Sequence, residues 1–130
     1  METKFNSQIC SSIEQSRRIV ELGLKPETAD MVWISMSGGH YIYAAPWSNH
    51  KRPQDIPAWS LHRLIEMMPD IIKDHIEEML YHLSIDGNSV FYENRSFDLC
   101  QFFGDNLYKA IIDCIEWLIK EGYFNKEYLV

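Results

Sequence analysis

The five histidines of this sequence, at positions 40, 50, 62, 75 and 82, are the side chains with the widest chemical range. With cysteines and acids they bind zinc when the ligands form a cluster, such as two on one helical face or a Cys-x-x-Cys pair. The sequence contains no such cluster. His75 and His82 would stand about 10 Å apart along a helix axis, too far to share an ion. We therefore predict no metal site and no bound cofactor.

Serine and the carboxylates offer two further kinds of chemistry. A nucleophilic enzyme needs a serine or cysteine beside a base, usually at a strand-to-helix elbow. The nearest approach is Ser37-Gly38-Gly39-His40, whose paired glycines are better explained by a hairpin turn. Asp113 and Glu116 have a spacing that suits acid–base chemistry or a cation, but in a chain this acidic the same spacing occurs on a solvated helix face. We predict no catalytic residue from these patterns.

The segment from Trp47 to Trp59 is the one candidate binding site. Its two tryptophans flank the only tight basic cluster, His50-Lys51-Arg52, in an otherwise acidic chain. Tryptophan and arginine are over-represented at binding hot spots. The sequence therefore predicts a recognition loop with Trp47, His50, Lys51, Arg52 and Trp59 as binding residues. The alternative is that Trp59 packs under the following helix and Trp47 covers a sheet edge.

Charge and cysteine usage limit the partners and the compartment. Nineteen Asp and Glu against 12 Lys and Arg give a net charge of −7, and the basic residues are scattered, which argues against direct nucleic-acid binding. A protein partner with a basic patch, or self-association, suits this surface better. Cys10, Cys100 and Cys114 form no disulfide framework, so reduced thiols in a cytoplasm are expected. The polar N-terminus and the lack of a long apolar stretch predict neither a signal peptide nor a membrane span.

The elements that position these residues start with a helix over 7–22, whose apolar face carries Ile9, Ile13, Val20 and Leu24 and whose end is Gly23. A short helix over 25–30 follows. Two strands, 32–36 and 41–44, form a hairpin around the paired glycines. The segment 45–58 has three prolines and no periodicity, so it is predicted to be a loop.

The second half of the chain begins with a helix capped by Ser60 and stopped by Pro69. The segment 70–82 fits a helix or a strand equally well. Strands over 80–85, 90–93 and 97–103 then form a meander, and Asp105 or Asn106 caps a long amphipathic helix that runs to Gly122.

Together these elements predict a single domain over residues 1–130, of a size and apolar content that suit one core. The fold class is α+β. An antiparallel sheet of about four to six strands, built from the hairpin and the meander, carries the long C-terminal helix and the shorter N-terminal and central helices.

Three segments resemble an uncharacterised family of small α+β proteins from gut-bacterial (Bacteroidetes-type) chromosomes, prophages and conjugative elements. They are Leu22–Met31, the stretch from Asp55-Ile-Pro-Ala-Trp-Ser-Leu61 to Met68-Pro69, and Asp105–Leu107 running into Cys114-Ile-Glu-Trp-Leu-Ile-Lys-Glu-Gly122. The resemblance implies an α+β domain of unknown function and carries no catalytic residues. It also implies that a meander starts after Pro69, which favours strands for part of 71–85.

As function, these observations favour a non-enzymatic interaction or accessory protein of a bacterial mobile element. It would bind a protein through the Trp47–Trp59 segment and its acidic surface. One alternative is a small enzyme or small-molecule-binding domain whose site assembles from separated residues such as His40, His62 or Glu66. Another is an inhibitor that mimics nucleic acid with a row of carboxylates.

Overall fold

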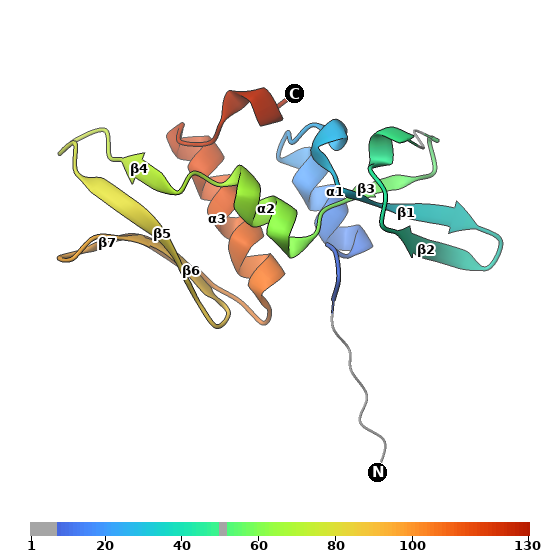
Figure 1. The fold of residues 1–130 in the computed structure, drawn as a ribbon, viewed down its shortest axis with the longest axis horizontal. Coiled ribbons are helices and arrows are strands. Elements are labelled where there is room, and N and C mark those ends of the chain that lie inside the picture. The colour runs from blue at the N-terminus through green and yellow to red at the C-terminus, as the bar shows by residue number, and fades with distance from the viewer. Residues whose placement is uncertain (1–7, 50–51) are drawn as a thin grey trace, which may run out of the picture. The chain divides into compact units, whose positions relative to one another are not determined.

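The structure is a computed structural model that describes residues 8–49 and 52–130. The chain divides into two compact units, Met1–Arg63 and Leu64–Val130 (Figure 1). The described residues contain three α-helices and seven strands, and every strand pair is antiparallel. The predicted α+β class is confirmed. The strands form two sheets, of three and four strands, where the sequence suggested one. The single domain stays a prediction.

The first unit begins with helix α1 (Ile13–Glu21), which starts later than predicted. A capping box fixes its start: the Ser12 hydroxyl accepts from the Gln15 N–H at 3.1 Å, and the Gln15 side chain accepts from the Ser12 N–H at 3.0 Å. Residues 8–11 are therefore outside the helix. The predicted apolar face is wrong at Ile9 and Val20, which are exposed, whereas Ile19 is fully buried. The predicted short helix is a 3₁₀ turn, η1 (Pro26–Thr28).

The three-stranded sheet of this unit has the order β2-β1-β3. Its bounds are β1 (Met31–Met36), β2 (Gly39–Tyr43) and β3 (Ile56–Ala58). The hairpin around the paired glycines is confirmed. The prediction of a loop over 45–58 is wrong at its end, because β3 pairs there with β1, and 3₁₀ turn η2 (Trp47–Asn49) lies at its start. A strand tolerates Pro57 because β3 is an edge strand of this sheet.

Helix α2 (Leu61–Met67) starts at the predicted cap, where the Ser60 hydroxyl accepts from the Arg63 N–H at 3.1 Å, and it ends before Pro69. The four-stranded sheet of the second unit follows, in the order β4-β5-β6-β7. Its strands are β4 (Ile71–Lys73), β5 (Leu80–Asp86), β6 (Ser89–Glu93) and β7 (Asp98–Phe103). The predicted meander is confirmed.

The segment 70–82, which fitted a helix or a strand, contains strand β4, a turn and the start of β5. The buried carboxylate of Asp74 accepts hydrogen bonds from the N–H groups of Ile76, Glu77 and Met79, at 3.2, 2.9 and 2.7 Å. These bonds, led by the one from Glu77, lower the pKa of Asp74. One aspartate thus holds the backbone of a turn, where continuous helix was the competing interpretation.

Helix α3 (Leu107–Glu121) packs against strands β6 and β7 within the second unit (Figure 1). The Asn106 side chain caps its first turn by accepting from the Lys109 N–H at 3.0 Å, and Gly122 ends it with φ +79°, as predicted. The core of this unit joins sheet and helix through fully or nearly buried side chains: Ile72, Tyr81, Val90, Tyr92, Ile111, Ile115 and Leu118. Across residues 8–49 and 52–130, no helix has the length and apolarity needed to cross a bilayer.

Candidate functional site

The predicted recognition segment is only partly a surface. His50 and Lys51 lie outside the described residues. Trp47, in η2, is half-buried, and its indole nitrogen is buried without a hydrogen-bond partner in the part of the chain that is described. Of these three residues the structure therefore describes only Trp47, which is half-buried.

Arg52 is engaged within its own unit. Its Nε and Nη2 atoms donate to the two carboxylate oxygens of Asp55 at 2.8 Å each, and Nη2 also donates to the Ser35 carbonyl at 3.2 Å. The Asp55 carboxylate is buried and accepts from the Ser35 N–H at 3.3 Å. The hydrogen bond to Asp55 raises the pKa of Arg52, so the guanidinium stays charged. This bidentate pair joins the end of the segment to strand β1, which is a structural role.

Trp59 is not available to a partner, and its assignment as a binding residue is corrected. Its side chain is 0% exposed. The indole N–H donates to the Thr28 hydroxyl at 3.0 Å, and the backbone N–H donates to the Ser11 hydroxyl at 3.0 Å. The ring is therefore buried with both of these N–H groups hydrogen-bonded. Trp59 belongs to the core of the first unit.

The three residues of the alternative site, His40, His62 and Glu66, are exposed and come from two elements. His40 lies on β2, His62 and Glu66 on α2. His75, in the turn after β4, stacks on Tyr123 with ring centroids 4.4 Å apart, and its Nε2 lies 2.9 Å from the Glu121 carbonyl oxygen. Within the described ranges, no three His, Cys, Asp or Glu side chains are grouped so as to hold a metal ion.

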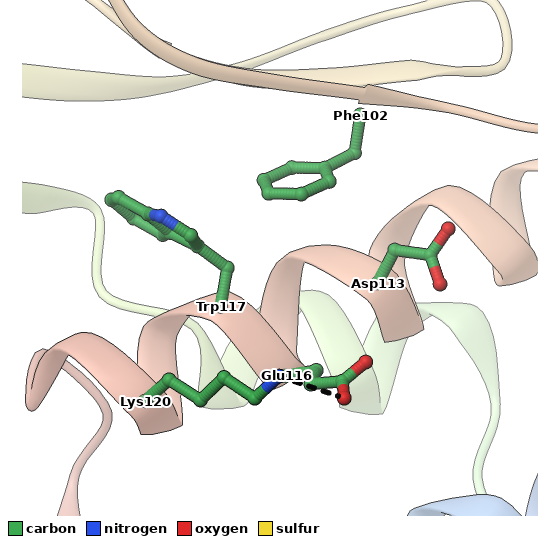
Figure 2. Close-up of a pocket in the computed structure, with 5 residues that line it drawn as sticks. All are labelled: Phe102, Asp113, Glu116, Trp117 and Lys120. Atoms are coloured by element: carbon green, nitrogen blue, oxygen red, sulfur yellow. Dashed lines mark ion pairs between the residues drawn. The ribbon is translucent and has the colours of Figure 1, made fainter.

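A groove of about 330 Å³ lies on the second unit, between the flank of α3 and strand β7. Phe102 points from β7 toward the helix and Trp117 points from α3 toward the sheet, with ring centroids 6.2 Å apart (Figure 2). Asp113, Glu116 and Lys120 complete the lining from the helix. The groove thus has aromatic walls and a charged rim.

Packing fixes the position of the Trp117 indole. Its ring centroid lies 6.4 Å from that of Tyr92 and 5.6 Å from that of Tyr123. Tyr92 is fully buried, and its hydroxyl donates to the Pro69 carbonyl at 2.8 Å. Because Tyr92 is fixed in the core and Tyr123 is stacked on His75, the indole offers a partly exposed face that does not have to be ordered when something binds.

The rim carboxylates are partly shielded from water and paired with lysines of the same helix. The Asp113 side chain is 24% exposed and pairs with Lys109 at 2.9 Å; Glu116 is 34% exposed and pairs with Lys120 at 3.4 Å (Figure 2). Such exposed i,i+4 pairs contribute only about 0.3–0.5 kcal/mol each. The lysines are therefore easily displaced from these carboxylates.

Asp113 and Glu116 were expected on a solvated helix face, whereas Trp117 and Phe102 were not predicted as site residues. A signal was present: Trp117 is four residues after Asp113 and three before Lys120, so a large aromatic shares their helix flank. Phe102 could not be added from the helix pattern, because it reaches the groove from a strand.

A second hollow of about 390 Å³ lies beside the turn between β6 and β7, lined by His82, Glu93, Asn94 and Arg95. His82 and Glu93 are direct cross-strand partners. The Asn94 carboxamide oxygen already accepts from the N–H groups of Ser96 and Phe97, at 2.9 and 2.8 Å, and so shapes the turn. This hollow has mixed charge and no aromatic wall.

Charge is divided unevenly between the two units. Residues 64–130 carry 13 Asp and Glu against five Lys and Arg, a net charge of −8. Residues 1–63 carry six acids against seven bases, a net charge of +1. The whole excess of negative charge therefore belongs to the unit that contains the groove.

Comparisons with protein-family models, with curated proteins and with solved structures give no match to this chain.

Proposed function

We propose that this chain is a non-enzymatic interaction protein whose second unit binds a basic segment of a protein partner. The observation that carries the proposal is the groove of Phe102 and Trp117, with carboxylates on its rim, in a unit of net charge −8. Aromatic side chains in partly desolvated pockets carry much of the binding energy of protein interfaces. The charge of the unit attracts a basic partner over distances longer than a contact.

The groove chemistry favours binding over catalysis. Asp113 and Glu116 each pair weakly with a lysine of their own helix, an arrangement in which a carboxylate accepts a cation that another cation can replace. The aromatic walls supply contact area, and a volume of about 330 Å³ is at the small end of ligand sites, so it suits a side chain of a larger partner. The proposed partner is therefore a protein segment.

The test is a titration of the full chain with short peptides of equal length, in which every charged position is basic in one and glutamate in the other. Amide and indole signals are followed by heteronuclear NMR. We expect the basic peptide to shift signals of the second unit, with an affinity that falls as salt rises. Equal binding of both peptides, or shifts confined to the first unit, contradicts the proposal.

The setting we propose is the cytoplasm of a bacterium, with the chain acting as an accessory protein of a mobile element. The resemblance of Leu22–Met31, Asp55–Pro69 and Asp105–Gly122 to proteins of prophages and conjugative elements supports this setting. The three free thiols suit a reducing compartment. The expected finding is that the encoding gene lies among integration or conjugation genes; a position among housekeeping genes in most genomes that carry it contradicts the setting.

A second candidate is an inhibitor that occupies the nucleic-acid-binding surface of its partner. The charge of −8 on the second unit is the observation that favours it. Such a mimic competes with nucleic acid for the partner, whereas a plain interaction protein does not. Once a partner is in hand, release of that partner from labelled DNA by the full chain is the measurement, and simultaneous binding of both rules out mimicry.

A further inference from the structure

We infer that the groove of Phe102 and Trp117 is a specific site for the guanidinium group of an arginine side chain on the partner, with Lys120 occupying the cation position until the partner binds. This inference rests on the proposed function, since it names the side chain that a basic partner inserts.

The aromatic walls favour a flat cation. A guanidinium is planar and weakly hydrated, so it stacks on an aromatic face, whereas an ammonium is compact and strongly hydrated. The Trp117 indole is half-buried and held by Tyr92 and Tyr123, and Phe102 meets it at an angle of 53° between ring planes. A guanidinium laid on the indole therefore meets a second ring at its edge.

The rim supplies the counter-charge beside that surface. Asp113 lies one helical turn before Trp117 on the same flank, and Glu116, one turn before Lys120, is part of the same groove lining (Figure 2). A carboxylate accepts two parallel N–H bonds from arginine, but only a point contact from lysine. Partial burial of both carboxylates lessens the screening by water and strengthens this pairing.

Lys120 places a cation beside the Glu116 carboxylate on the rim of the groove. Its ammonium lies 3.4 Å from the Glu116 carboxylate, longer than the 2.9 Å of the Lys109–Asp113 pair, and the Lys120 side chain is 72% exposed. A lysine in such an exposed ion pair competes only weakly with an incoming cation. Removing this lysine must therefore strengthen arginine binding, whereas it would weaken binding if Lys120 served to hold an anionic ligand.

The experiment compares two basic peptides of equal length and charge, one with arginine and one with lysine at every charged position, titrated into the full chain. The indole signal of Trp117, identified with a Trp117→Phe variant, reports on the groove. We expect the arginine peptide to bind about 5-fold more tightly than the lysine peptide and to shift this signal. Glu116→Gln is expected to reduce this preference to less than about 2-fold.

Two control variants make the same charge changes outside the groove lining, on 3₁₀ turn η3 (Lys126–Tyr128): Glu127→Gln and Lys126→Met. Lys120→Met is expected to tighten arginine-peptide binding about 2- to 3-fold more than Lys126→Met does. Equal binding of both peptides, with Glu116→Gln matching Glu127→Gln, overturns the arginine site but leaves the basic partner in place. Weaker arginine binding in Lys120→Met also overturns it. Binding of neither peptide refutes the proposed function itself.

Discussion

Replacing Trp59 tests most directly whether the segment after η2 recognises a partner or builds a core. The indole is 0% exposed, and its N–H donates to the hydroxyl of Thr28, which in turn donates to the Lys25 carbonyl at 2.6 Å. Trp59→Ala removes a fully buried aromatic side chain, a change that typically costs about 3–5 kcal/mol of unfolding free energy. The first unit is expected to lose most or all of its stability.

Trp59→Phe separates the hydrogen bond from the bulk of the ring. It keeps an aromatic side chain and the two backbone bonds to Ser11, while it removes the indole N–H and part of the ring. Loss of a buried hydrogen bond contributes about 1 kcal/mol, and the smaller ring adds a cavity cost, so we expect about 1–3 kcal/mol in total. The matched control is Trp47→Phe, because that indole nitrogen has no hydrogen-bond partner within the described residues. It should cost clearly less.

The assay is urea unfolding of the full chain, followed by far-UV circular dichroism and by the amide signals of β1. A lowered midpoint for Trp59→Phe, with unchanged affinity for the basic peptide, is the expected pair of results. The reasoning is refuted if Trp59→Phe leaves the β1 midpoint where it was and weakens peptide binding, since that would place the indole at a recognition surface.

Three further predictions concern the caps and thiols. Gly122→Ala should lower the free energy of unfolding, measured in urea, by about 1 kcal/mol. Because φ is +79° there and an added Cβ meets no neighbour within 4 Å, the whole cost is backbone strain. No loss would mean that the helix end relaxes freely. Burial, followed by the charge of Asp30, raises the pKa of the Cys10 thiol to about 11. The unfolded chain therefore loses this proton at a lower pH than the folded chain does, and the free energy of unfolding falls by up to about 3 kcal/mol from about pH 9 to pH 11. A Cys10→Ala variant should lack this part of the alkaline loss, and an identical pH profile would contradict the assignment. The Cys114 thiol donates to Cys100, which lowers the pKa of Cys100, whereas the same bond and burial raise the pKa of Cys114. Iodoacetamide at neutral pH should therefore label Cys100 before Cys114 and Cys10, as peptide mass spectrometry can show. Equal labelling rates would contradict the pairing.

Local signals in the sequence were sufficient for much of the fold. Helix ends are marked by residues that contact backbone groups only a few positions away in the sequence. These residues are the caps Ser60 and Asn106 and the left-handed Gly122, and their type and spacing locate helix ends without tertiary information. The paired glycines of the first hairpin work in the same way. These positions are where the prediction and the structure agree most closely.

Prediction failed where a distant partner decides the outcome. Strand β3 was hidden by Pro57, which a strand tolerates only because its neighbour β1 lies on one side. The turn after β4 depends on one buried carboxylate, that of Asp74, which helix and strand patterns do not register. Burial of Trp59 depends on Thr28 and Ser11, both far away in the sequence.

Dependence on distant partners also explains why the candidate site lies on an acidic helix and not on the predicted basic loop. Arg52 was predicted to bind a partner because it is a cation in an acidic chain. It forms a bidentate pair with the buried Asp55, so its role is structural. Asp113 and Glu116 looked like ordinary surface charges, yet strand β7 brings Phe102 to the helix flank that they share with the half-buried Trp117. A charge acquires a binding role from the groups that other elements bring to it, and a one-dimensional pattern cannot supply those groups.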